Sequence, residues 1–83
     1  MSTSSEVIKV LAEVLQVGAR ADQWDDSTAL LGSTPELDSM AVVTVIGALE
    51  ERFAISVADD EISAETFSTV GTLSAFVESK RQA

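Results

Sequence analysis

The residues best suited to chemistry in this 83-residue chain are Asp38-Ser39-Met40, where a long polar stretch ends and an apolar stretch begins. A hydroxyl at the start of a helix lies beside backbone N–H groups that have no partner within the helix. These N–H groups and the helix dipole favour negative charge, so a phosphate is stabilised there. Ser39 is therefore predicted to be the attachment point of a phosphate-linked arm, with Asp38 as the N-cap of the helix.

The chain lacks most of the residues on which catalytic and metal sites depend. The chain has no histidine and no cysteine, so Ser–His and Cys–His nucleophile pairs, disulfides and thiolate zinc sites are excluded. It also lacks a glycine-rich phosphate loop and the ligand spacing of a calcium-binding loop. The remaining candidates are carboxylate groups at Asp25-Asp26, Glu50-Glu51 and Asp59-Asp60-Glu61. No organising groups accompany them, so solvated surface is the favoured interpretation, and loose cation binding by the last run stays open. We expect neither an enzyme nor a metal site.

The charge balance limits the classes of partner. Fourteen acidic and five basic residues give a net charge of −9, which argues against nucleic acid and favours a partner with a basic patch. An apolar fraction of 46% argues against disorder. No stretch approaches the ~20 apolar residues of a membrane span, and the N-terminus lacks the pattern of a leader. We expect a monomeric, cytoplasmic protein with one domain over residues 1–83 and an ordered core over about 4–81.

The spacing of apolar residues predicts helices in most of the chain. The first expected helix opens with a capping box at Thr3 and Glu6 and ends at Gly18. A second helix should run from Asp38 to about Phe53, followed by a short helix from Asp59 to near Ala64. The last helix should be capped by Ser68 or Thr69, with Lys80 and Arg81 in its final turn. A long connection over residues 19–37 separates the first two. Its expected anchors are Trp24, Leu30, Leu31 and Leu37.

Helical geometry divides the second helix into two faces. The predicted core face carries Val42, Ile46, Leu49 and Phe53, with Val45 at its edge. The opposite face carries Met40, Thr44, Gly47 and Glu51, and Ser39 and Val43 lie between the two. Met40 is therefore expected to be exposed beside the serine.

The segment Leu37-Asp38-Ser39-Met40, together with Leu49-Glu50-Glu51-Arg52-Phe53, resembles the acyl carrier protein family. The likeness extends from about Val7 to Val77. It implies an all-α, acyl-carrier-like four-helix bundle with three main helices, one short helix and a long first loop. It also implies that a phosphopantetheinyl transferase attaches 4′-phosphopantetheine from coenzyme A to Ser39, beside Asp38. The thiol of this arm would carry acyl intermediates as thioesters to partner enzymes.

The resemblance also implies roles for further residues. The expected partner-binding residues are Met40, Val43, Thr44, Gly47, Glu50 and Glu51. The candidate residues for an acyl pocket are Val43, Ile46, Ile62 and Phe67, which are alternatively plain core residues. The partners would be the transferase and acyl- or aminoacyl-activating and acyl-transfer enzymes with basic docking patches.

Two positions depart from the family's pattern. Carriers of fatty-acid synthesis often have acids two and five residues after the serine, where this chain has Ala41 and Thr44. We therefore expect a specialised bacterial carrier in lipid or secondary-metabolite biosynthesis, served by a dedicated partner. Residues 35–43 are also similar to carriers from exopolysaccharide and exosortase gene clusters. An aminoacyl, D-alanyl or peptidyl carrier and an acidic adaptor without a prosthetic group stay open as alternatives, and a small hydrolase is a distant third.

Overall fold

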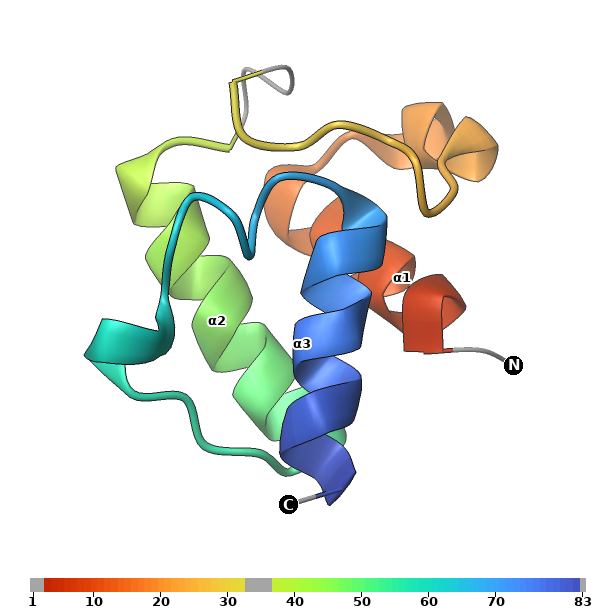
Figure 1. The fold of residues 1–83 in the computed structure, drawn as a ribbon. Helices are drawn as coiled ribbons and strands as arrows, with labels where there is room; N and C mark the ends of the chain where they lie inside the picture. Colours follow the sequence, from red (N-terminus) through yellow and green to blue (C-terminus); the bar gives the residue numbers. More distant parts are fainter. Residues whose placement is uncertain (1–2, 33–36, 83) are drawn as a thin grey trace.

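Three α-helices form the body of the molecule, and the first packs against both of the others (Figure 1). The computed structural model describes residues 3–32 and 37–82. In chain order the helices are α1 (Thr3–Leu15), the 3₁₀ helix η1 (Gly18–Gln23), α2 (Ser39–Phe53), the 3₁₀ turn η2 (Asp59–Glu61) and α3 (Val70–Gln82). Within the described ranges the strand-like pairing is limited to one isolated bridge, between Ala29 and Thr69. The predicted all-α class is confirmed, and the expected short helix is the single turn η2, which ends before Ala64.

The end of α1 differs from the prediction. Gln16, directly after Leu15, takes the left-handed conformation with φ 56°, and the Val17 N–H donates to the Ala12 carbonyl at 3.3 Å. This 6→1 hydrogen bond closes the helix two residues before Gly18. Gly18 instead begins η1, so its predicted role as the cap of α1 was wrong.

The capping box predicted at the start of α1 is also absent. The Thr3 hydroxyl donates to Glu78 Oε1 on α3 at 2.6 Å, and Glu6 Oε1 accepts from Arg52 on α2 at 2.9 Å. The hydrogen bond from Arg52 holds the pKa of Glu6 below its ordinary value. Thr3 and Glu6 each bond to a charged side chain on another helix, Glu78 and Arg52 respectively, and do not form the predicted reciprocal pair. Hydrogen bonds to charged groups are stronger than those between neutral groups.

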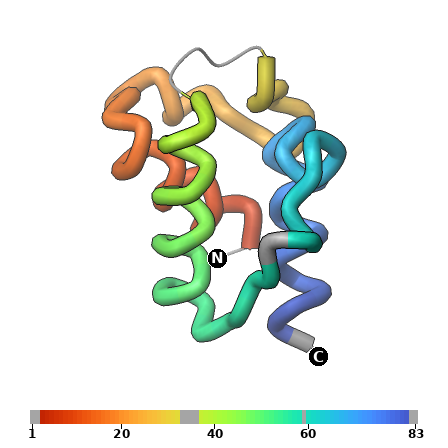
Figure 2. Tube along the Cα trace, turned by 90° about the vertical axis from the view of Figure 1, so that its left-hand side faces the viewer, coloured from red at the N-terminus to blue at the C-terminus, as the bar shows by residue number. Residues whose placement is uncertain are grey.

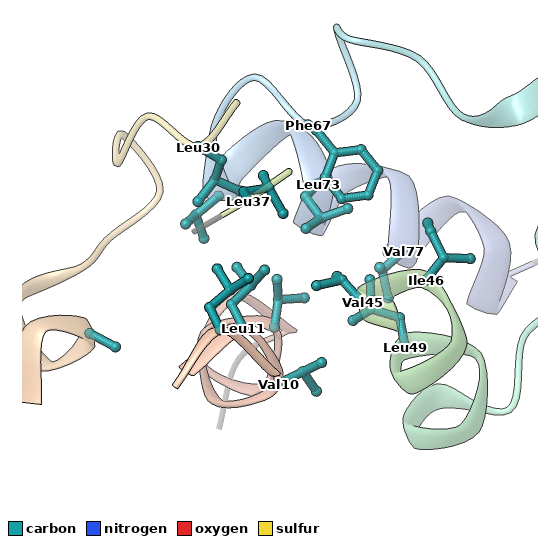
Figure 3. Close-up of a cluster of buried hydrophobic side chains, with 14 of the residues drawn as sticks. Val10, Leu11, Leu30, Leu37, Val45, Ile46, Leu49, Phe67, Leu73 and Val77 are labelled. Carbon is teal, nitrogen blue, oxygen red and sulfur yellow. The ribbon is translucent and has the colours of Figure 1, made fainter. Parts of the chain in front are cut away.

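The core lies where the three helices meet and is closed from above by the connections (Figure 3). Its buried side chains are Val7, Val10, Leu11, Leu15, Val17, Ala21, Leu30, Leu37, Val45, Ile46, Leu49, Ile55, Phe67, Val70, Leu73 and Val77. Leu30 and Leu37 are buried anchors as predicted, and Trp24 packs half-buried against the cluster. Leu31 is 42% exposed, so its predicted anchoring role was wrong.

The core face of α2 is turned slightly from the predicted one. Val45, expected at the edge, is fully buried, whereas Val42 and Phe53 are half-buried. The Phe53 ring lies at the rim, where the Arg81 guanidinium carbon sits 5.4 Å from the ring centroid. Because α2 contacts both α1 and α3, the side chains that point between these two helices, such as Val45, are the most deeply buried.

The two connections are joined to each other across the top of the bundle (Figures 1 and 2). We call four backbone hydrogen bonds here the two-loop ladder. With the donor first, two join the connections, Leu30 to Ser68 (2.9 Å) and Leu31 to Phe67 (3.0 Å), and two join the first residues of α3 to the first connection, Val70 to Thr28 (3.0 Å) and Gly71 to Asp26 (2.8 Å). The ladder gives the first connection ordered backbone partners without a strand. The rest of that connection, residues 33–36, lies outside the described part of the chain.

Candidate functional site

The start of α2 is built by the side chain of Asp38. This residue is extended, with φ −102° and ψ −174°, and its Oδ1 accepts the Ala41 N–H at 2.8 Å. Its carbonyl accepts the Val42 N–H at 2.9 Å. The short carboxylate therefore satisfies a helix-start N–H that would otherwise lack a partner, and the prediction of Asp38 as N-cap is confirmed.

Ser39 is the first residue of α2, and its side chain is exposed. Within residues 3–32 and 37–82, neither its hydroxyl nor its N–H has a hydrogen-bond partner. The hydroxyl at the start of α3 behaves differently, because Thr69 Oγ1 accepts the Thr72 N–H at 3.1 Å and so acts as the cap. At α2 the cap is Asp38, which leaves the serine hydroxyl accessible and beside the positive end of the helix dipole. Among the residues that the structure describes, this arrangement leaves room for a phosphodiester at Ser39.

The outer face of α2 runs from this serine along the helix. Met40 is 77% exposed and Val43 68% exposed, and Thr44 and Gly47 are also exposed. Glu51 continues the same face at its far end. The structure thus places five of the six predicted partner-binding residues on one face of α2, with Met40 and Val43 nearest to Ser39 and Glu51 at the far end.

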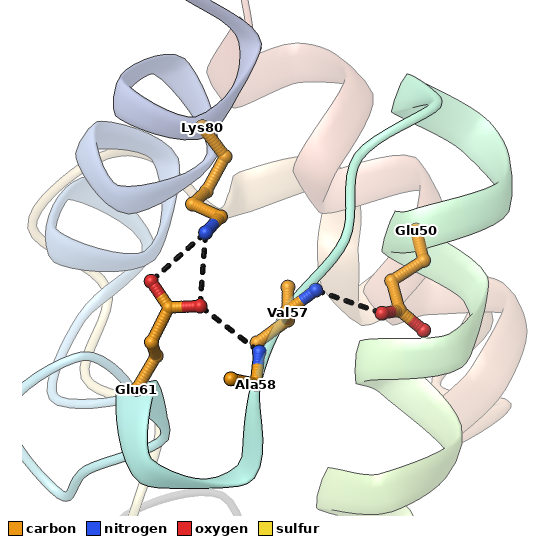
Figure 4. A network of polar contacts seen from close by, with 5 residues as sticks. All are labelled: Glu50, Val57, Ala58, Glu61 and Lys80. Carbon is orange, nitrogen blue, oxygen red and sulfur yellow. Dashed lines mark hydrogen bonds and ion pairs between the residues drawn. The ribbon is translucent and has the colours of Figure 1, made fainter. Parts of the chain in front are cut away.

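Glu50, the sixth, points elsewhere. Its Oε2 accepts the Val57 N–H at 2.8 Å, which turns the carboxylate toward the second connection (Figure 4). Its side chain is accordingly half-buried. In this structure Glu50 holds the segment that follows α2 and does not contribute a free charge to the outer face.

An apolar groove of about 210 Å³ lies between the two connections and α2. Its lining residues are Leu31, Val42, Ile62, Ser63, Ala64 and Phe67. Of the predicted pocket residues, Ile62 and Phe67 line this groove, whereas Ile46 is buried in the core and Val43 is on the outer face. Leu31 and Val42 were missed as lining residues. The signal for Leu31 was its place as a second apolar residue after Leu30, within a polar stretch.

A family model described as a phosphopantetheine attachment site matches residues 5–77. The chain belongs to this family. It is also similar to a holo acyl carrier protein from Nitrosomonas europaea, solved by solution NMR, with 53% sequence identity over the whole of both chains and a TM-score of 0.92. A search of curated proteins gave no match. The predicted membership of the acyl carrier protein family and the covalent cofactor 4′-phosphopantetheine are confirmed.

A polar network holds the second connection of this carrier against α3 (Figure 4). Lys80 Nζ lies 2.9 and 2.8 Å from the two carboxylate oxygens of Glu61, and Glu61 Oε1 accepts the Ala58 N–H at 2.9 Å. The backbone N–H of Ala58, and then the Lys80 ammonium, hold the pKa of Glu61 below its ordinary value. The carboxylate of Glu61 is therefore occupied by partners from this chain.

Among residues 3–32 and 37–82, no group of three or more acidic side chains is placed to hold a metal ion. The side chain of Asp59, one member of the acidic run considered for cations, lies outside the described part. None of the described helices is both long enough and apolar enough to cross a bilayer.

Proposed function

We propose that this protein carries acyl groups on a 4′-phosphopantetheine arm attached to Ser39. The observation that supports this most directly is the exposed hydroxyl at the first position of α2, left accessible because Asp38 acts as the cap. An acyl carrier needs its serine to project from the fold, so that a transferase and later enzymes can reach the arm. Ser39 meets this need, whereas the hydroxyl of Thr69, at the start of α3, is engaged in capping.

In the loading step the Ser39 Oγ would form a bond to the pantetheine-side phosphorus of the pyrophosphate in coenzyme A. The bond from that phosphorus to the bridging oxygen of the pyrophosphate breaks, adenosine 3′,5′-bisphosphate leaves, and the serine proton passes to a base. The chain supplies no base for this step, because it has no histidine and the Asp38 carboxylate is committed to the Ala41 N–H. The base must come from a separate phosphopantetheinyl transferase. Once bound, the arm supplies a terminal thiol that holds the acyl group as a thioester, which a chain without cysteine lacks.

Partner enzymes would bind the outer face of α2. The proposed docking residues share this face, which begins at the attachment residue and supports their role; they are Met40, Val43, Thr44, Gly47 and, at the far end, Glu51. Glu50 is the weakest member of the predicted set, because its carboxylate already accepts a hydrogen bond within the carrier.

The apolar groove lined by Ile62 and Phe67 would receive part of the acyl cargo. Its volume of about 210 Å³ is below the 300–1,000 Å³ typical of small-molecule pockets, so it suits a short or partly inserted chain. We place the protein in the cytoplasm as a monomeric carrier domain over residues 1–83. The uncharged residues Ala41 and Thr44 support a dedicated bacterial partner in lipid or secondary-metabolite biosynthesis.

The deciding experiment is the intact mass of the protein after incubation with coenzyme A and a broad-specificity phosphopantetheinyl transferase. Wild type and the control Ser68→Ala, which alters an exposed serine near the start of α3, should each gain one phosphopantetheine. Ser39→Ala should gain none while keeping its helical circular-dichroism signal, because the position is an exposed helix start. Modification of Ser39→Ala, or no modification of wild type by several transferases, would refute the proposal; the latter result would favour the adaptor alternative.

A further inference from the structure

We propose that Lys80 limits the length of the acyl chain that this carrier can enclose, although it does not line the apolar groove itself. Its ammonium holds Glu61 in place, and Glu61 fixes the start of one wall of the groove. The inference rests on the proposed function and deepens it, since it requires an acyl chain carried on Ser39. Lys80 is thereby a positioning residue for the cargo.

One wall of the groove is formed by the second connection. Residues 62–64 follow Glu61 directly and line the groove together with Phe67. The remaining lining residues are Leu31 of the first connection and Val42 of α2. The position of residues 62–64 relative to α2 therefore sets the width of the groove.

The start of this wall is held by a side chain of α3. Lys80 Nζ lies 2.9 and 2.8 Å from the two carboxylate oxygens of Glu61, as Figure 4 shows. Backbone packing does not hold it, because in the described part of the chain η2 packs closely against none of the other helices. The side chains of Lys80 and Glu61 are 23% and 34% exposed, so solvent screens this pair less than a fully exposed one. The pair therefore tethers the wall beside Ile62, which packs half-buried against the core.

The tethered stretch has a fixed point on each side. Before it, the Val57 N–H donates to a carboxylate of α2 at 2.8 Å, and after it, the Thr66 carbonyl accepts the hydroxyl of a threonine on α3 at 3.0 Å. Among the described residues, the hydrogen bonds of residues 62–65 stay within the second connection. Once the pair with Lys80 is broken, residues 58–65 can bow away from α2 without loss of any further described hydrogen bond to a helix.

This arrangement makes the enclosed length of a chain depend on the ion pair. While Lys80 holds Glu61, a guest can widen the groove only at the end formed by Phe67, against the two-loop ladder. Methylene groups that exceed the volume of about 210 Å³ then stay in water and gain nothing from burial. With the pair broken, the bow makes room for further methylene groups, and each one buried favours enclosure. The pair should therefore change the preference between short and long chains, and not only the stability of the fold.

The test measures how far an acyl chain raises the Tm of each variant above that of its own holo form. A broad-specificity transferase loads the apo-protein from butanoyl-, octanoyl- or dodecanoyl-coenzyme A, and mass spectrometry verifies the load. Lys80→Met keeps an aliphatic stem and removes the ammonium, whereas Lys80→Arg keeps a cation that can bind both carboxylate oxygens. Lys9→Met is the matched control, because it removes the same charge from an exposed lysine paired with Glu6 on α1.

The expected result is a change in chain-length dependence for one variant. In wild type, Lys80→Arg and Lys9→Met, the step from octanoyl to dodecanoyl should raise the Tm by less than about 2 °C. In Lys80→Met the same step should raise it by about 4–8 °C, the shift expected when one or two further methylene groups are buried in a domain of this size. Comparison with the holo form of the same variant removes any loss of stability that is common to all chains.

A second measurement follows the tether without any cargo. In the apo-protein the amides of Ala58 and Glu61 are hydrogen-bonded at η2. Lys80→Met should lower their hydrogen-exchange protection about tenfold, whereas Lys9→Met should leave it unchanged.

Three results would overturn the inference. They are the same chain-length dependence in wild type and Lys80→Met, a pattern in Lys80→Arg that matches Lys80→Met, and unchanged protection of the Ala58 and Glu61 amides in Lys80→Met. Failure of wild type to take up any of the three chains would instead refute the proposed function itself, so the two failures are distinguishable.

Discussion

Replacing Gly71 with alanine should destabilise the protein, although alanine is the better helix former. Gly71 lies in the first turn of α3, and its N–H donates to the Asp26 carbonyl at 2.8 Å as part of the two-loop ladder. A Cβ at this position would lie 2.9 Å from the same carbonyl oxygen and 3.3 Å from the Asp26 Cβ. The first distance is shorter than a carbon–oxygen contact allows, so the first connection must move away.

The magnitude follows from three contributions. Loss of the hydrogen bond costs about 0.5–1.5 kcal/mol. Forcing a methyl group into a filled space costs about 1–3 kcal/mol. Against these, alanine gains at most about 1 kcal/mol of helix propensity, and less within the first turn. The net loss is about 0.5–4.5 kcal/mol, and each kcal/mol lowers the Tm of a domain of this size by roughly 4–8 °C.

Gly47→Ala is the matched control, because it makes the same exchange in α2 where the added methyl meets nothing within 4 Å. This variant should gain about 0.5–1 kcal/mol. Urea unfolding followed by circular dichroism measures both variants against wild type. If Gly71→Ala proves as stable as Gly47→Ala, the close approach of Asp26 to α3 does not exist in solution and the ladder is misplaced.

Three further perturbations probe the core, the cap and the polar network. Leu49→Ala should lower the free energy of unfolding in urea by about 2–5 kcal/mol, because Leu49 is only 1% exposed. Truncation of the half-buried Phe53 should lower it by less. An unchanged midpoint for Leu49→Ala would contradict the core assignment. Asp38→Ala should cost about 1 kcal/mol and speed hydrogen exchange in the first turn of α2, and unaltered exchange there would exclude the cap. Because the pKa of Glu61 is lowered from its ordinary value of 4.5, its stabilising contribution is fully present above that pH and is lost as the pH falls through the lower folded-state pKa. The expected NMR result is that the protection factor of the Ala58 amide falls on acidification in wild type but not in Glu61→Gln, and identical acid profiles of the two proteins would refute it.

The sequence predicted α2 well because its signals are local. Asp38 is a strong cap, the apolar spacing that follows has a helical period, and Phe53 is the last helical residue as expected. The exposure of Met40 followed from the same geometry. At the start of α3, Thr69 was correctly named as one of two possible caps, because its side chain bonds to a residue three positions away.

The errors occur where a partner distant in the sequence decides the outcome. Glu6 could not be assigned to Arg52, 46 positions away, so a local capping box was predicted instead. The hydrogen bond from the Val57 N–H to Glu50, seven positions apart, was also not foreseen, whereas the partner-binding role of Glu50 stays a prediction. Val45 became fully buried because α2 contacts two helices, and a helical wheel does not show from which sides neighbours approach.

The two-loop ladder links the opening of the groove to movement of the first connection. Leu31 and Phe67 both line the groove, and the Leu31 N–H donates to the Phe67 carbonyl, 36 positions along the chain. The second connection therefore cannot swing outward to admit a larger guest without breaking this bond or pulling the first connection along. Amides on both sides of the ladder should thus exchange with solvent through one shared opening event rather than independently. A guest that widened the groove would therefore also disturb the backbone of residues 28–31 in the first connection.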